Sequence, residues 1–239
     1  MKRITTTLIA VAVALFVLTG CMNLSAITGS GNVVSQEYDF AGFDEVDISH
    51  AFIATISPGD EFSVVVRVDD NLVEHLVVEQ EGNRVRVGLE QGAIATRATM
   101  EVDITMPRLT WLNASGASQV QLNGLLLDDN FTGEASGASQ IHGDVDAVDM
   151  VLEASGASTV FLAGTAGNVR ATASGASTID LTELAAIDAQ TEASGASNVT
   201  VNIEGILDAD ASGASKIFYL GQPEMGNINT SGGSDVEQR

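Results

Sequence analysis

The sequence predicts an all-β protein, a single-domain β-solenoid (β-helix) of about 19-residue coils with irregular N-terminal strands. Three observations support this prediction. The tetrapeptide Ser-Gly-Ala-Ser recurs through the C-terminal half, and apolar and polar residues alternate around each copy. The composition is 45% hydrophobic but only 5% aromatic, so the core must consist mainly of small and β-branched side chains, which suit thin, regular layers.

The repeat has a regular period. A degenerate copy, Ser-Gly-Gly-Ser, closes the series, and the steps between successive copies are 21, 19, 19, 20, 18 and 19 residues. Such a fixed period is typical of stacked coils, in which each coil buries its apolar face only against its neighbours. The seven copies begin at Ser115, Ser136, Ser155, Ser174, Ser194, Ser212 and Ser231.

Alternation around the tetrapeptide indicates strands on both sides of it. The fifth residue after the first serine is β-branched and apolar in every copy, and the residue before that serine is alanine in six copies. Residues between these positions are mainly polar, which is the pattern of strands with one buried face. The tetrapeptide itself predicts a corner: glycine permits unusual backbone angles, small side chains let corners stack about 4.8 Å apart, and serine hydroxyls can bind backbone groups.

The N-terminus predicts export and lipid attachment. Lys2 and Arg3 precede an apolar run, and Leu-Thr-Gly-Cys ends at Cys21, the one cysteine in the sequence. Residues 1–20 are therefore predicted to be a lipoprotein signal peptide, with Cys21 the lipidated residue. Met22 follows Cys21, which resembles an outer-membrane sorting signal. An uncleaved membrane anchor is the alternative, but the apolar run is short for a span.

The remaining chain is predicted to be one domain behind a tether. Residues 21–32 are polar and glycine-containing and are predicted to be the tether, and residues 33–239 are predicted to be the solenoid domain. Strand-like segments between residues 33 and 107 are out of register with the repeat, so we expect irregular coils that cap the solenoid. Glu81-Gly82-Asn83 predicts a hairpin loop, and residues 70–76 predict the one helical turn. Residues 235–239 are expected to cap the other end.

The charge disfavours anionic partners. The chain carries a net charge of −22, and removing residues 1–20, which contain Lys2, Arg3 and no acid, changes it to −24. Nucleic acid binding needs basic contacts to phosphates, so no nucleic acid partner is expected.

One outward-facing column of the predicted solenoid is acidic. It lies two residues before each tetrapeptide, where carboxylates on adjacent coils would stand about 4.8 Å apart. Like charges at that distance repel, and a calcium ion could bridge them through carboxylate oxygens. We expect a solvated acidic surface there and no cofactor; weak calcium binding is the alternative. The candidate cation ligands are Glu134, Glu153, Glu192 and Asp210.

No catalytic constellation is predicted. The histidines at positions 50, 75 and 142 have no metal-ligand spacing, and the carboxylates follow the repeat. His142, Phe161 and Phe218 share one outward column that could stack on carbohydrate, although we expect them not to lie on adjacent coils. Trp111 is expected to close the first coil.

The stacked Ala-Ser-Gly-Ala-Ser-x-Val-x-Leu motifs resemble the head GIN domain family, described as auto-transporter adhesins. Residues 43–56, 61–72 and 82–87 resemble the same family, so the similarity covers about residues 33–235. The resemblance implies a β-helical fold on an exported envelope protein, and brings no catalytic residues with it.

We therefore expect a lipid-anchored, non-catalytic cell-envelope protein that acts as an adhesin or binding scaffold. Its expected partners are the membrane, through the lipid anchor, and an extracellular polysaccharide or protein ligand. The expected location is the outer membrane, on its periplasmic side or at the cell surface. The alternatives are a purely structural envelope protein without a ligand and a β-helix enzyme that acts on polysaccharide.

Overall fold

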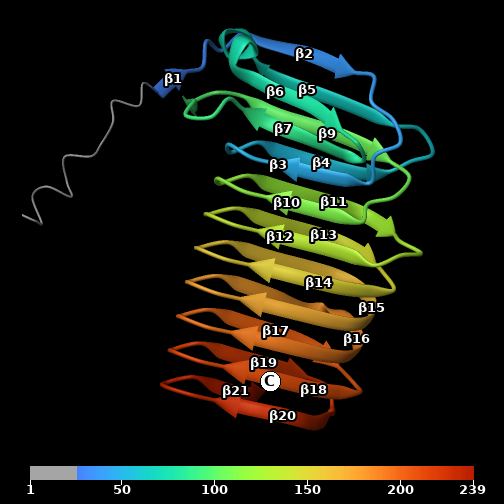
Figure 1. The fold of residues 1–239 in the computed structure, drawn as a ribbon, viewed down its shortest axis with the longest axis vertical. Helices are drawn as coiled ribbons and strands as arrows, with labels where there is room; N and C mark the ends of the chain where they lie inside the picture. Colours follow the sequence, from blue (N-terminus) through green and yellow to red (C-terminus); the bar gives the residue numbers. More distant parts are fainter. Residues whose placement is uncertain (1–25) are drawn as a thin grey trace, which may run out of the picture.

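The structure is a computed structural model that describes residues 26–239. The predicted signal peptide and Cys21 lie outside these residues. Coils stack into a rod below an irregular cap (Figure 1), and the predicted all-β solenoid is confirmed. None of the helices formed by residues 26–239 is long and apolar enough to cross a membrane.

The repeats form two faces joined at the tetrapeptide corners. Face 1 consists of the strands that run into each corner: β10 (Trp111–Ala114), β12 (Phe131–Ala135), β14 (Asp149–Ala154), the second halves of β15 (Thr159–Ala173) and β16 (Thr178–Ala193), β18 (Ile206–Ala211) and β20 (Glu224–Thr230). Face 2 consists of the strands that leave the corner: β11 (Gln119–Leu126), β13 (Gln140–Asp146), the first halves of β15 and β16, β17 (Asn198–Ile203), β19 (Lys216–Leu220) and β21 (Asp235–Gln238).

Pairing between coils is parallel and in register with the repeat. On face 1, Ala154 pairs with Ala173, and Ala173 pairs with Ala193. On face 2, Val160 pairs with Ile179 of the next coil. Each residue therefore lies beside its equivalent in the neighbouring coil, as the aligned sequence copies predict.

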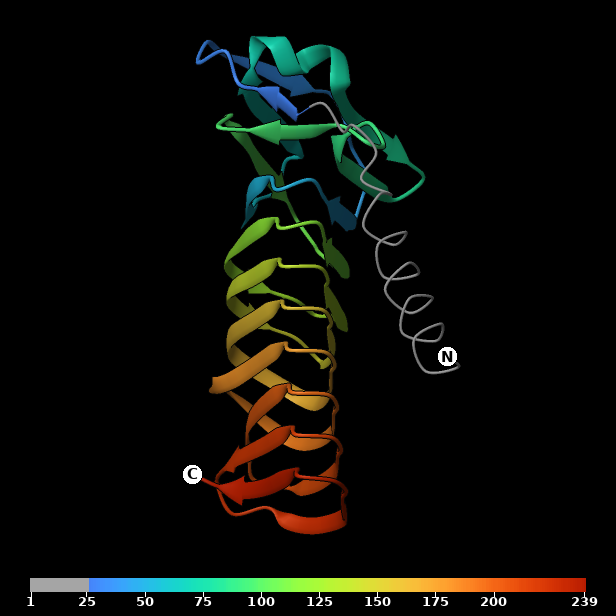
Figure 2. The ribbon, with the colours of Figure 1, turned by 90° about the vertical axis from the view of Figure 1, so that its left-hand side faces the viewer.

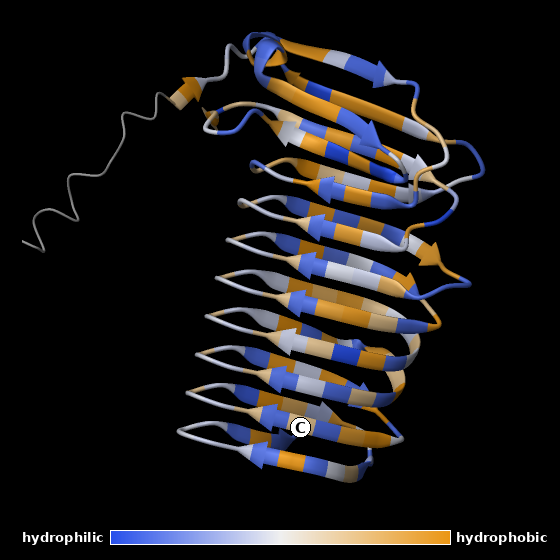
Figure 3. Ribbon diagram, in the orientation of Figure 1, coloured by the Kyte–Doolittle hydropathy of each residue, from blue (hydrophilic) through white to orange (hydrophobic). Residues whose placement is uncertain are grey.

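The core follows from this register. Hydrophobic and hydrophilic bands alternate along the strands (Figure 3), and the β-branched residues after the corners lie inside. Val160, Ile179, Val199 and Ile217 are fully buried, while the alanines before the corners fill the narrow end of the core. Small side chains are needed there because the two faces converge at the corner.

The corner explains why the tetrapeptide recurs. The glycine of each full copy has a positive φ, +75° at Gly156 and +76° at Gly175, a region that favours glycine. The second serine is buried, and in the fourth full copy the Ser177 hydroxyl donates a bifurcated hydrogen bond to the carbonyl oxygens of Ala154 and Ser174, at 2.9 and 2.8 Å. This serine therefore joins each corner to the preceding coil.

The cap combines antiparallel and parallel strands. The antiparallel part contains β2 (Val33–Tyr38), β5 (Ser63–Asp69) and β9 (Met100–Met106), and a hairpin of β6 (Leu76–Glu81) and β7 (Arg84–Leu89), with the expected loop between the hairpin strands. A 3₁₀ helix, η1 (Asp70–His75), forms the predicted helical turn. The strands β3 (Glu45–Ile48) and β4 (Ile53–Pro58) pair in parallel with β10 and β11, which joins the cap to the first repeat.

An additional corner lies between β3 and β4. Residues 49–52 stack on the first tetrapeptide: the amide of Ser115 donates to the carbonyl of Ile48, and the amide of Gln119 donates to that of Phe52. His50 and Ala51 have φ values of +60° and +64°, although neither is glycine. The solenoid therefore begins one coil earlier than the repeated tetrapeptide indicates.

The two ends of the described chain differ from expectation. Residues 26–32, expected within a free tether, contact the cap: β1 (Ala26–Thr28) pairs in parallel with β8 (Ile94–Thr96), and both views place it at the cap end (Figures 1 and 2). Residues 235–239 do not form a separate cap. Asp235–Gln238 form β21, which pairs with β19 as the last strand of the last coil.

Candidate ligand-binding face

The predicted acidic column lies on face 1, and its register is as expected. Asn113 pairs with Glu134, and Glu134 with Glu153. Thr172 follows Glu153, and the next neighbours are Glu192 and Asp210. Because Thr172 interrupts the series, the four carboxylates form two adjacent pairs rather than one continuous row.

One carboxylate of each pair already has a partner. The Trp111 indole nitrogen donates to Glu134 at 2.9 Å, and the Arg170 guanidinium binds Glu192 at 2.9 Å. Across residues 26–239 no three His, Cys, Asp or Glu side chains gather into a metal-binding group. Weak calcium binding by these carboxylates stays the alternative to a solvated acidic surface, and it would need solvent or ligand oxygens to complete the coordination.

Face 1 is hollowed along its length. A cavity of about 480 Å³ lies over β16, β18 and β20, and a second of about 360 Å³ lies over β14, β15, β16 and β18. A third, of about 160 Å³, lies over β10, β12 and β14 near the cap. The largest cavity is lined by hydrogen-bonding side chains that include Gln190, Glu192, Asp208, Asp210, Asn227 and Asn229. This face therefore offers donors and acceptors in successive coils.

Hydrogen bonds between Asp and Asn side chains order the part of face 1 that lies away from the tetrapeptide corners. Asp149 accepts hydrogen bonds from the backbone and side-chain nitrogens of Asn168, at 2.8 and 2.7 Å. Three coils after Asp149, Asp208 accepts hydrogen bonds from the same two groups of Asn227, at 2.6 and 3.1 Å. These contacts hold the edge of the cavities in place, so the polar groups that line them are preorganised.

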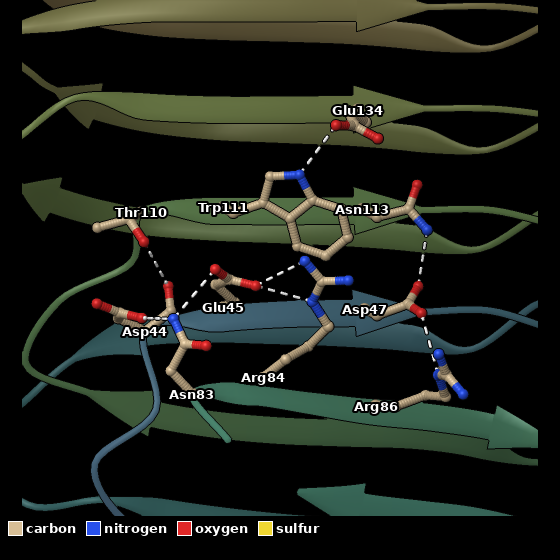
Figure 4. A network of polar contacts seen from close by, with 10 residues as sticks. All are labelled: Asp44, Glu45, Asp47, Asn83, Arg84, Arg86, Thr110, Trp111, Asn113 and Glu134. Carbon is tan, nitrogen blue, oxygen red and sulfur yellow. Dashed lines mark hydrogen bonds and ion pairs between the residues drawn. The ribbon is translucent and has the colours of Figure 1, made fainter. Parts of the chain in front are cut away.

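A polar network joins face 1 to the cap (Figure 4). The Arg84 guanidinium lies 3.9 Å from the centre of the Trp111 ring and pairs with Glu45 at 2.7 Å. Beside it, Asp47 accepts a hydrogen bond from Asn113 at 2.7 Å and pairs with Arg86. Trp111 thus joins Arg84 of the cap to Glu134 of the repeats.

Face 2 corrects one expectation. His142 and Phe161 do lie on adjacent coils: they are paired residues of β13 and β15, and their ring centres are 6.1 Å apart. Each stands six residues after the first serine of its tetrapeptide, and Ser136 and Ser155 begin consecutive copies, so the repeat itself places the two residues side by side. Phe218 lies three coils beyond Phe161, where the Arg239 guanidinium covers its ring at 3.6 Å. In the last coil, a hydrogen bond with Asp235 raises the pKa of Glu237.

Two of the histidines lie beside hydroxyl or carboxylate groups. His50 Nδ1 lies 2.9 Å from the Ser49 hydroxyl oxygen, and His75 lies near Glu74 and Glu90. A nucleophile–base pair is usually oriented by a third group. Among residues 26–239, the Ser49 hydroxyl is the one side-chain hydrogen-bond partner of His50, so no carboxylate orients this pair.

Comparison with known proteins agrees with this architecture. A crystal structure of a putative adhesin from Bacteroides fragilis is similar with a TM-score of 0.78 and 17% identity, covering 90% of this chain and 100% of that one. A putative lipid binding protein from Parabacteroides distasonis gives a TM-score of 0.71 at 18% identity, with 90% and 100% coverage. A putative adhesin from Parabacteroides merdae gives 0.65 at 16% identity, with 90% and 99% coverage.

At such low identities, these structures establish the fold alone. No match was found among the curated proteins compared. The sequence of residues 42–223 matches the family described as "Putative auto-transporter adhesin, head GIN domain", which is well over half of the chain. This match confirms the family resemblance seen in the repeats, and the chain belongs to the head GIN domain family of adhesin-like proteins.

Proposed function

We propose that this protein is a lipid-anchored, non-catalytic adhesin of the bacterial cell envelope, which binds an extended polysaccharide or protein segment on face 1. Lipidation of Cys21 would hold it in the outer membrane. The family's adhesin-like character supports an external partner, and the hollowed face 1 provides a surface for it.

The single observation that carries the proposal is the line of cavities on face 1. Successive coils place equivalent polar groups about 4.8 Å apart, so the surface repeats along the rod. An extended polymer with many hydroxyl or amide groups can bind such a surface one unit at a time. The carboxylates accept hydrogen bonds and the amides both donate and accept them, which suits carbohydrate hydroxyls and peptide groups.

The test is an array of glycans and extracellular-matrix proteins, probed with unlipidated protein from residue 22, with and without calcium. Saturable binding to a defined ligand is expected. Binding that requires calcium would add support for cation binding by Glu134, Glu153, Glu192 and Asp210. If no ligand binds in either condition, the adhesin proposal is wrong and a purely structural envelope protein is favoured.

A pair of matched variants locates the site. Asp210→Ala with Asn229→Ala removes one carboxylate and one amide from face 1, and Asp235→Ala with Asn198→Ala removes the same groups from face 2. Each lost hydrogen bond is worth about 1 kcal/mol, so the face 1 variant should bind about tenfold or more weakly. The face 2 variant should bind normally. Equal losses in both variants would show that face 1 is not the binding surface.

A further inference from the structure

The segment that follows the predicted lipid attachment site is fixed to the cap. In addition to the β1–β8 pairing, the amide of Gly29 donates to the carbonyl of Thr96 at 3.0 Å. The Asn71 side chain binds the segment twice: its nitrogen donates to the carbonyl of Thr28 at 2.9 Å, and its oxygen accepts the amide of Ser30 at 3.0 Å.

Two neighbouring aspartates complete this attachment. The Ser30 hydroxyl and the Asn32 side-chain nitrogen donate to Asp70. The Asp69 carboxylate is 1% exposed and accepts the amide of Gly31 at 3.4 Å. Gly29 passes so close that a Cβ there would lie 1.9 Å from the Asp69 carboxylate, so the segment is packed into the cap and not merely laid on it.

The attachment leaves a short connection to Cys21. Four residues separate Cys21 from Ala26. Since consecutive residues span at most about 3.6 Å, Ala26 lies within roughly 18 Å of Cys21. The repeats, by contrast, extend over roughly 34 Å at about 4.8 Å per coil. A lipid on Cys21 can therefore bring the cap to the membrane without bringing the last coil there.

The surface beside the attachment suits lipid headgroups. We define the anchor surface as residues 26–31 and 94–97. Ile94 is 42% exposed, and Arg97 is exposed and forms no ion pair with any residue of 26–239. The four other arginines of the cap are each paired with carboxylates: Arg67, Arg84, Arg86 and Arg108. An apolar side chain beside a free guanidinium can contact both the acyl boundary and the lipid phosphates.

The net charge has the same sign over the repeats and over the cap. Residues 111–239 contain 17 acidic and 3 basic residues, a net charge of −14. Residues 26–110 contain 15 acidic and 5 basic residues, a net charge of −10, so anionic headgroups repel both parts, and the orientation follows from the short connection to Cys21 and from the anchor surface.

We propose that the anchor surface lies against the headgroups of the bilayer that holds the Cys21 lipid, and that the solenoid projects from it with β20 and β21 outermost. This inference rests on the proposed lipidation of Cys21. It assigns the cap to the membrane and presents the largest cavity of face 1, over β16, β18 and β20, at the distal end.

The test uses the full lipoprotein in vesicles of phosphatidylcholine and phosphatidylglycerol that contain a headgroup-labelled quencher lipid. Because lipidation consumes Cys21, one introduced cysteine can be labelled with a fluorophore uniquely. Thr96→Cys labels the anchor surface, and Thr230→Cys is a matched control, an exposed strand threonine in the last coil. Quenching should be several-fold stronger at position 96 than at position 230. Arg97→Gln should weaken the quenching at position 96.

The outcomes separate this inference from the proposed function. Mass spectrometry of each sample establishes whether Cys21 is acylated. Acylated, vesicle-bound protein with equal quenching at both positions, or stronger quenching at position 230, would overturn the proposed orientation while leaving the lipoprotein intact. Protein that carries no lipid and does not bind vesicles would refute the lipidation itself, and the orientation with it.

Discussion

The corner glycines provide the sharpest test of the solenoid. Gly175 has a φ of +76°, and a Cβ built on it would lie 2.6 Å from the carbonyl oxygen of Gly156 in the preceding coil. That oxygen also accepts the amide of Ala176 at 2.7 Å, so it cannot move without losing a hydrogen bond. The backbone cost of alanine at positive φ is about 1–2 kcal/mol, and the overpacking adds about 1–3 kcal/mol. Gly175→Ala should therefore destabilise the protein by about 2–5 kcal/mol.

Gly124→Ala is the matched control. Gly124 also has a positive φ, +62°, but nothing lies within 4 Å of its would-be Cβ. Only the backbone cost of about 1–2 kcal/mol should remain. Urea unfolding of residues 22–239, followed by far-ultraviolet circular dichroism, measures both. With a slope of about 3 kcal/mol per molar urea, Gly175→Ala should lower the midpoint by roughly 1 M, clearly more than the control. Equal midpoints in the two variants would refute the close stacking of corners.

Three other predictions follow from local contacts. Ser177→Ala should cost about 1–2 kcal/mol in urea unfolding because a buried hydroxyl loses its carbonyl partners, whereas Ser174→Ala, at the half-exposed position of the same corner, should cost less than half as much. The hydrogen bond from the Ser30 hydroxyl lowers the pKa of Asp70 in the folded protein. The ionised Asp70 therefore stabilises the attached segment fully above the ordinary pKa of 3.8, and this stabilisation is lost as the pH falls through the lower pKa of the folded state. Hydrogen exchange of the backbone amides of residues 26–31 should become faster relative to the unfolded chain in that acidic range, and an Asp70→Asn variant should lack this pH dependence. Cys21→Ser should release the protein from membranes in cell fractionation; a variant that still sediments with the envelope would argue against lipid anchoring.

The structure of the repeats could be predicted because residues at equivalent positions in the sequence copies are also neighbours in space. In a solenoid, each residue packs against its equivalents in the neighbouring coils, so aligning the sequence copies already aligns the structure. The buried column of Val160 and Ile179, the alanine column and the outward carboxylates all follow from that alignment. The antiparallel strands of the cap pair at long range instead, and no repeat in the sequence reports their register.

The first corner was missed for a specific reason. Ser49 lies 66 residues before Ser115, and its corner contains His50 and Phe52 where the repeats have glycine and serine. Only the pairing of β3 with β10 identifies it as a coil. The attachment of residues 26–32 was also missed, because a short polar segment gives no sign of the side chains at positions 69–71 that bind it.

The candidate site was predictable only in part. The sequence placed Glu134, Glu153, Glu192 and Asp210 in one column, and the structure keeps them there. The interruption by Thr172 was visible in the sequence, but the engagement of Glu192 by Arg170 depends on side-chain geometry. The cavities depend on the shape of face 1, which no single column of residues specifies.

The in-register stacking also makes the length of the molecule adjustable. Each coil depends on the coil above and the coil below, and successive corners are joined by the same serine and glycine contacts. Removing residues 155–173 would bring two equivalent corners into contact and shorten the rod by about 4.8 Å. Duplication or loss of a 19-residue unit is therefore a simple genetic route to a longer or shorter rod that keeps one cap and one kind of surface.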